Sequence, residues 1–221
     1  MNRKWIALLL LLVFSLPAAG DPRAAYKVET IGACTSPDVS DAVKKTLQEQ
    51  GLRVVGDSGP FCEVWLRKVL PQSAGTGTDY NTLAAGTFVG VIQYLNKGSD
   101  YRGQTIKPGI YTMRYQTMPS DGNHMGVSPT PDYFILMPPN AEKDPDVVVE
   151  YQDVIKLGKQ ASGLSHICPL YLTAPTGGGS PAFKSVDESH WALEAKTKAQ
   201  PKGGAEIDFP IAIILVGKSE A

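Results

Sequence analysis

Hydrophobic and polar positions alternate along much of the chain after residue 85, with the period of two that is typical of β-strands. In the clearest stretch Tyr111, Met113 and Tyr115 alternate with polar residues, so one face is apolar and the other polar. Similar alternating or continuous apolar runs predict strands at residues 88–95, 133–137, 168–172, 191–196 and 211–216. Most gaps between these runs are too short for a crossover helix, so we expect antiparallel pairing.

The N-terminal part of the chain has a mixed pattern. A strand at residues 26–31 precedes a helix that we expect to begin at the N-cap Ser36, followed by Pro37, and to end at Gly51. Two further strands are expected on either side of a five-residue connection: residues 52–55 and 61–70.

One later segment, residues 146–160, fits two structures. Val147, Val148 and Val149 favour a strand, whereas Val154 and Ile155, with Leu157, favour a short helix.

These patterns predict a mainly β (α+β) fold, an antiparallel β-sandwich with a small N-terminal α/β portion. We expect a signal peptide over residues 1–20, the α/β portion over residues 21–70 packed on the main domain, and the β-sandwich domain over residues 71–221.

The first twenty residues have the three-part pattern of a secretory signal peptide. Arg3 and Lys4 precede an apolar run, Pro17 breaks it, and small residues follow. The apolar run is shorter than the roughly 20 residues that a spanning helix needs, although an uncleaved anchor is the alternative. We expect an exported protein, periplasmic or secreted, without a membrane span after cleavage.

Charge excludes one class of partner. Cleavage after residue 20 removes two basic residues and leaves 19 basic against 22 acidic side chains, with no Lys/Arg cluster. A nucleic-acid-binding protein would show a basic patch, so we expect no nucleic-acid partner.

Three cysteines remain in the exported chain. Cys34 and Cys62 are 28 positions apart beside predicted strands, and a disulfide between them would contribute about 3.5 kcal/mol on chain-entropy grounds. The alternatives are buried free thiols, or a pairing with Cys168, which is otherwise the odd cysteine.

Two stretches resemble known proteins. The segment RGQTIKPGIYTMRYQ, residues 102–116, resembles the Pro-Gly-x-Tyr strand pair of secreted β-sandwich modules of the transthyretin or carboxypeptidase-regulatory type. Much of residues 85–217, including SHWALEA and PIAIILVG, resembles uncharacterised exported bacterial proteins. The resemblance implies an exported β-sandwich, and it brings no activity or catalytic residue with it.

The stretch VVGDSGPFC contains Gly-Asp-Ser, a sequence in which several hydrolases present a nucleophile. Chymotrypsin-like proteases need a histidine before the serine, and none precedes Ser58. In a GDSL-type esterase Asp121 and His124 would complete the site, but that fold needs a helix after the serine, and a strand is expected here. We interpret Ser58 as a turn residue, and a GDSL-type hydrolase is our third hypothesis.

The scattered histidines permit a second hypothesis, a periplasmic copper or zinc site. His166 and Cys168 would share a face in an extended segment, and His124 and His190 could converge on them. The alternative is that the histidines bind loops and strand ends while Cys168 packs as a small hydrophobic residue.

Aromatic residues in the alternating segments could also form a carbohydrate platform. We expect core packing or ordinary surface placement instead for these side chains: Trp65, Tyr101, Tyr111, Tyr115, Tyr133 and Trp191.

Our first hypothesis is an exported, non-catalytic binding or accessory module for an unknown protein or small molecule. We predict no catalytic residue and no cofactor. Polar groups in loops or at strand ends, flanked by apolar runs, are the candidate binding residues: Asp121, His124, Asp132, His166 and His190.

Overall fold

The computed structural model describes residues 26–118, 128, 130–177 and 180–217 of the 221-residue chain. The predicted signal peptide and the candidate residues Asp121 and His124 lie outside the described residues. Within the described ranges, no helix is both long enough and apolar enough to cross a membrane.

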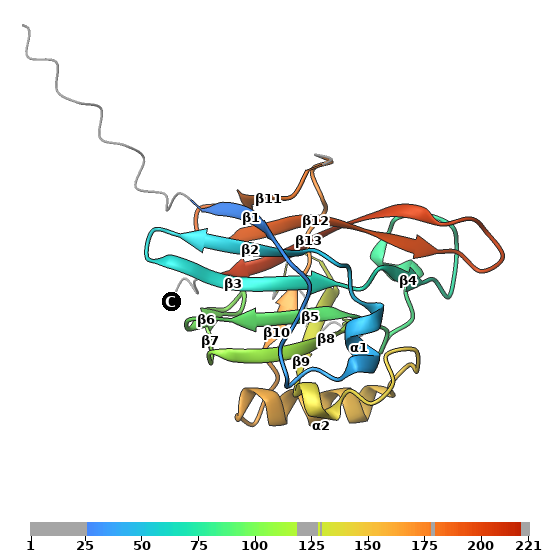
Figure 1. The fold of residues 1–221 in the computed structure, drawn as a ribbon, viewed down its shortest axis with the longest axis horizontal. Helices are drawn as coiled ribbons and strands as arrows, with labels where there is room; N and C mark the ends of the chain where they lie inside the picture. The colour runs from blue at the N-terminus through green and yellow to red at the C-terminus, as the bar shows by residue number, and fades with distance from the viewer. Residues whose placement is uncertain (1–25, 119–127, 129, 178–179, 218–221) are drawn as a thin grey trace, which may run out of the picture.

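Seven strands form one antiparallel sheet, in the spatial order β1-β2-β3-β5-β8-β9-β10 (Figure 1). The strands are β1 (Lys27–Ile31), β2 (Gly51–Gly56), β3 (Gly59–Leu66), β5 (Phe88–Tyr94), β8 (Gly109–Thr117), β9 (Asp132–Met137) and β10 (Pro169–Tyr171). The predicted N-terminal strands are therefore continuous with the strands from the middle of the chain.

A second sheet packs against the first. Its strands are β4 (Val69–Pro71), β11 (Ala182–Ser185), β12 (Trp191–Gln200) and β13 (Ile207–Val216), with β4 parallel to β12. After β10 the chain reaches β13, where Leu172 bridges to Ile213 and the Thr173 N–H donates to the Ala212 carbonyl at 3.0 Å. A small hairpin, β6 (Gly98–Ser99) and β7 (Thr105–Ile106), forms a separate two-stranded sheet beside the end of β13. The predicted mainly β, antiparallel fold is confirmed.

The main core lies between the two sheets and follows the alternation of the strands. Val64 and Leu66 of β3 enter this core, while Trp65 between them points to the outer face of the seven-stranded sheet. The helices α1 (Asp41–Thr46) and α2 (Tyr151–Ser162) cover that outer face, and short 3-10 turns lie at Tyr80–Thr82 and Pro139–Ala141 (Figure 1).

The first helix is shorter than predicted. Its N-cap is Ser40, whose hydroxyl accepts from the Val43 N–H at 3.3 Å, rather than Ser36. It ends before Leu47, because Leu47 bridges to Arg67 and the next residue also bonds to strand β3. Pairing with β3 therefore overrides the helical spacing.

Gly51 does not end the helix; it begins β2 beside an indole ring. A Cβ at this position would lie 2.3 Å from Trp65 Nε1. The ring is held there because Nε1–H donates to the Gly32 carbonyl at 2.9 Å.

The predicted strand at residues 61–70 is two strands. β3 lies in the large sheet, and after Arg67 and Lys68 the chain crosses to the second sheet as β4. Arg67 holds the crossing, since its Nε–H donates to the Val69 carbonyl at 2.9 Å.

The turn interpretation of Ser58 agrees with the structure. Asp57 and Ser58 form a tight hairpin turn between β2 and β3, with Gly59 at a φ of 101°. The hydrogen bonds of the two described histidines, His166 and His190, go to other residues.

The predicted Cys34–Cys62 disulfide is wrong, because both thiols are free. Cys62 of β3 packs in the core between the sheets, whereas Cys34 packs with Val43 and Trp65 under α1 on the opposite face. Burial raises the pKa of both thiols. Cys168 is also free and buried, and burial raises its pKa to about 11.

The ambiguous segment 146–160 contains a helix. Val154 of α2 is fully buried against β9, while Val147 and Val148 precede the helix and are exposed.

Candidate ligand-binding site

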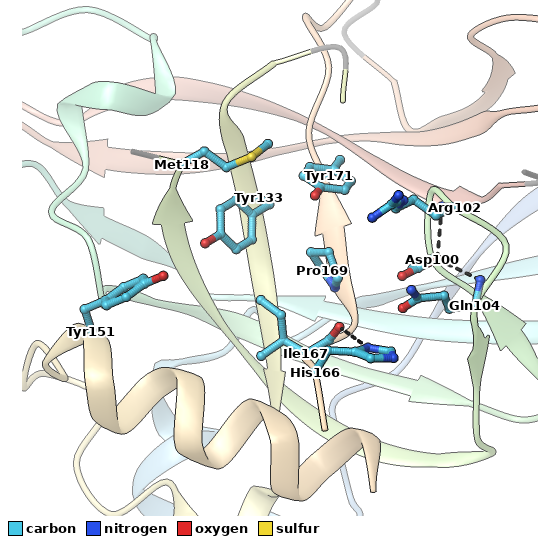
Figure 2. A pocket seen from close by; sticks show the side chains of 10 residues that line it. All are labelled: Asp100, Arg102, Gln104, Met118, Tyr133, Tyr151, His166, Ile167, Pro169 and Tyr171. Atoms are coloured by element: carbon cyan, nitrogen blue, oxygen red, sulfur yellow. Dashed lines mark hydrogen bonds between the residues drawn. The ribbon is translucent and has the colours of Figure 1, made fainter. Parts of the chain in front are cut away.

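A pocket of about 410 Å³ lies on the outer face of the seven-stranded sheet, beside the first turn of α2 and the β6–β7 hairpin (Figure 2). We call it the tyrosine pocket. Its lining residues are Asp100, Arg102, Gln104, Met118, Tyr133, Tyr151, His166, Ile167, Pro169 and Tyr171.

Tyrosines from neighbouring strands form the floor of the pocket. Tyr133 of β9 and Tyr171 of β10 are register partners, and their ring centroids are 5.7 Å apart. Both point outward because the alternating residues Phe134 and Leu170 fill the core between the sheets. Tyr151, the first residue of α2, adds a third ring at the side.

The opposite wall is the turn between β6 and β7. Asp100 organises this turn, because its Oδ1 accepts from the Arg102 N–H at 3.0 Å and from the Gln104 N–H at 2.8 Å. Gly103 adopts a φ of 78°, and its N–H donates to the Asp100 carbonyl at 3.0 Å. Figure 2 shows the heads of Asp100, Arg102 and Gln104 directed toward the tyrosines.

Two oxygen atoms in this wall have no hydrogen-bond partner among the residues that the structure describes. Asp100 Oδ2 and Gln104 Oε1 are both buried and unpaired, and the Asp100 residue is only 1% exposed. Burial raises the pKa of the Asp100 carboxyl, while the two backbone N–H donors and the charges of Arg102 and His166 oppose that rise. A buried acceptor without a donor is costly, so this wall is suited to a partner that supplies N–H or O–H groups.

Two basic side chains stand at the mouth of the pocket. Arg102 is exposed and forms no ion pair with any residue that the structure describes. Its charge reaches the floor of the pocket: burial raises the pKa of Tyr171, and the positive charge of Arg102 partly opposes that rise. His166 is also exposed, with Nδ1 3.2 Å from the Ile167 carbonyl.

The hairpin turn is anchored from behind by His190. The His190 ring stacks on Tyr101, Nε2 is 2.9 Å from the Tyr101 carbonyl, and Nδ1 is 2.8 Å from Asp187 Oδ1. Tyr101 lies between two residues of the pocket wall, Asp100 and Arg102, so this contact fixes the wall.

The predicted binding residues are distributed over different places. His166 lines the tyrosine pocket, and His190 lies behind its wall. Asp132 lines a second pocket of about 450 Å³, together with Asp79. Its Oδ1 accepts from the Tyr115 hydroxyl at 2.5 Å, and burial and then the Asp79 charge raise its pKa.

The predicted metal ligands do not meet among the described residues. Cys168 is buried in the core between the sheets, while His166 is exposed at the pocket mouth. The described ranges contain no group of three His, Cys, Asp or Glu side chains that could hold a metal ion. Since His124 lies outside these ranges, the four-ligand site stays a prediction.

The sequence patterns did not point to Asp100, Arg102 and Gln104, and they assigned Tyr133 to core or surface packing. A signal was present, since an aspartate followed by Gly103 three residues later is typical of a turn built on a side-chain acceptor. What brings this turn beside the floor tyrosines is a long-range contact, which no local pattern contains.

No protein-family model matches the sequence, and no curated protein or solved structure matches the chain.

Proposed function

We propose that the protein is an exported small-molecule-binding module, and that the tyrosine pocket binds a small organic carboxylate that carries a ring. The observation that supports this most directly is the position of Arg102, a cationic side chain without an ion-pair partner among the described residues, above a floor of tyrosines. Export is supported by the signal-peptide pattern of residues 1–20.

The floor favours a flat, partly apolar ligand. Tyr133 and Tyr171 line a concave site with aromatic surface, and Pro169 of β10 and Ile167, which precedes β10, add aliphatic surface. Small-molecule sites commonly combine such a surface with a few polar groups that orient the ligand. Aromatic pairs gain about 0.5–1.5 kcal/mol beyond simple burial, which favours a ring over an aliphatic chain.

The mouth favours an anion. A guanidinium group offers a planar set of N–H donors that fits a carboxylate in a bidentate arrangement. His166 lies at the same mouth, and its imidazole ring offers a further polar group to the ligand. A ring on the floor and a carboxylate at Arg102 therefore use both parts of the pocket.

Isothermal titration calorimetry with 3-phenylpropionate tests the proposal, with 3-phenylpropanol as the uncharged analogue. We expect 3-phenylpropionate to bind, and 3-phenylpropanol to bind at least tenfold more weakly. Arg102→Gln should remove that difference, because a charge-assisted hydrogen bond contributes about 1.5–3 kcal/mol.

Lys202→Gln is the matched control, since it removes one exposed positive charge beyond the end of β12. It should leave the affinity unchanged. The proposal is wrong if 3-phenylpropionate does not bind, or if Arg102→Gln binds it as tightly as the wild-type protein does.

A further inference from the structure

Two acceptor oxygens in the wall of the tyrosine pocket lack a hydrogen-bond donor among the described residues. Asp100 Oδ2 and Gln104 Oε1 are buried without a hydrogen-bond partner in the described part of the chain, and both side chains point toward the pocket (Figure 2). Asp100 is held in this position, because its other oxygen accepts from two backbone N–H groups of the turn. A ligand group with several N–H hydrogens is the chemical complement of such acceptors.

The guanidinium group of Arg102 lies near the Asp100 carboxylate but is not paired with it. Arg102 is close enough for its charge to lower the pKa of the Asp100 carboxyl, which burial raises. The two side chains nevertheless form no ion pair, so the guanidinium and the carboxylate are more than 4.0 Å apart. An opposite pair of charges on one ligand can lie between them, each charge against its complement.

We infer that the ligand is a zwitterion with an ammonium group next to its carboxylate, such as an α-amino acid with a ring in its side chain. Arg102 binds the carboxylate, and Asp100 and Gln104 accept hydrogen bonds from the ammonium group. This inference rests on the proposed function, because it adds a second recognition element to the same pocket. An ammonium group has three N–H donors, which is enough for both free oxygens.

Asp100→Asn separates ligand recognition from folding. Asparagine keeps an Oδ1 that can accept from the Arg102 and Gln104 N–H groups, so the turn should form. It replaces Oδ2 by a neutral NH₂ group, which cannot accept from an ammonium group and which removes the cost of burying a carboxylate. We therefore expect the variant without ligand to be at least as stable as the wild-type protein.

The test compares two ligands that differ only in the α-ammonium group, L-phenylalanine and 3-phenylpropionate, by isothermal titration calorimetry. The wild-type protein should bind L-phenylalanine at least tenfold more tightly than 3-phenylpropionate. Asp100→Asn should bind the two ligands equally, because it lacks the carboxylate that distinguishes them. Gln104→Met, a second variant that leaves Asp100 intact, should reduce the preference for L-phenylalanine several-fold.

The outcomes distinguish the inference from the proposed function. If the wild-type protein binds 3-phenylpropionate as tightly as L-phenylalanine, the zwitterion inference is wrong and the carboxylate site stands. The zwitterion inference is equally wrong if Asp100→Asn retains the preference for L-phenylalanine. If neither ligand binds, the carboxylate site itself is wrong, and the inference falls with it.

Discussion

The phenol ring of Tyr101 lies flat against the imidazole of His190, with centroids 4.0 Å apart and planes 10° apart. The same imidazole connects two loops, since Nδ1 is 2.8 Å from Asp187 Oδ1 and Nε2 is 2.9 Å from the Tyr101 carbonyl. A carboxylate and a carbonyl can only accept hydrogen bonds. Both ring nitrogens must therefore carry a proton for both bonds to form, so the arrangement requires an imidazolium ion.

The Asp187 carboxylate of this arrangement predicts how the pocket wall responds to acid. The pKa of Asp187 lies below its ordinary value, because the donors Ser189 N–H and His190 outweigh the partial burial that would raise it. Asp187 therefore stays charged until the pH falls below its usual titration range, and its stabilising effect is lost only there.

Amide hydrogen exchange at residues 100–104 measures the effect, because the backbone N–H groups of this turn are hydrogen-bonded to Asp100 and Gln104. After correction for intrinsic rates, protection should hold as the pH falls to about 3.9, the ordinary pKa of an aspartate, and should fall about tenfold only below it, as expected for the loss of one hydrogen bond to a charged group. His190→Gln should lack this protection at every pH, and His166→Gln should retain it. Equal protection in His190→Gln and in the wild-type protein would contradict the prediction.

The sequence predicted most strands because alternation is a local signal. The period of two at residues 111–115 marked β8, and the continuous apolar run at 133–137 marked β9. The alternation did not predict that the polar face of β8 is buried. Thr112 and Arg114 on this face are 0% exposed, because a later segment around residues 142–149 covers them. A local pattern cannot show which distant segment covers a face.

The errors at the first helix and at the cysteines have the same cause. Helical spacing favoured a helix as far as Gly51, but Leu47 pairs with Arg67 across the sheet. The spacing of Cys34 and Cys62 allowed a bridge, but the alternation of β3 places Cys62 on the face opposite to Cys34. In both cases the deciding contact joins segments far apart in sequence.

Gly51 and Gly32 provide a matched pair for testing the packing around Trp65. A Cβ at Gly51 would meet Trp65 Nε1 at 2.3 Å, whereas a Cβ at Gly32 has no atom within 4 Å. Trp65 is buried and its indole N–H is bonded to the Gly32 carbonyl, so the ring cannot move aside without losing that bond.

Gly51→Ala should therefore lower the free energy of unfolding by about 1–3 kcal/mol, the usual cost of overpacking. Gly32→Ala should change it by less than about 0.5 kcal/mol. Urea denaturation followed by tryptophan fluorescence gives both values. Equal midpoints for the two variants would show that the indole of Trp65 does not set the approach of β2.

Arg114 and Glu142 form an ion pair whose side chains are 0% and 2% exposed. Arg114 Nε–H donates to Glu142 Oε2 at 2.9 Å, and the guanidinium also donates to the Val147 carbonyl at 2.7 Å and to the Gly86 carbonyl. Glu142→Leu would leave the guanidinium buried without its counter-charge. We expect a loss of about 3–5 kcal/mol in the free energy of unfolding, because no ion pair would offset the cost of desolvating the guanidinium group.

Asp208→Asn is the control, since Asp208 pairs with Lys196 at 3.0 Å on an exposed face of the second sheet. Its urea midpoint should stay close to that of the wild-type protein, because exposed pairs are screened by solvent. Added salt should change the wild-type urea midpoint only slightly. It should also leave the difference between the midpoints of the wild-type protein and Glu142→Leu nearly constant, since salt screens buried charges weakly. A Glu142→Leu midpoint equal to that of Asp208→Asn would mean that the segment over β8 is held by its apolar contacts alone.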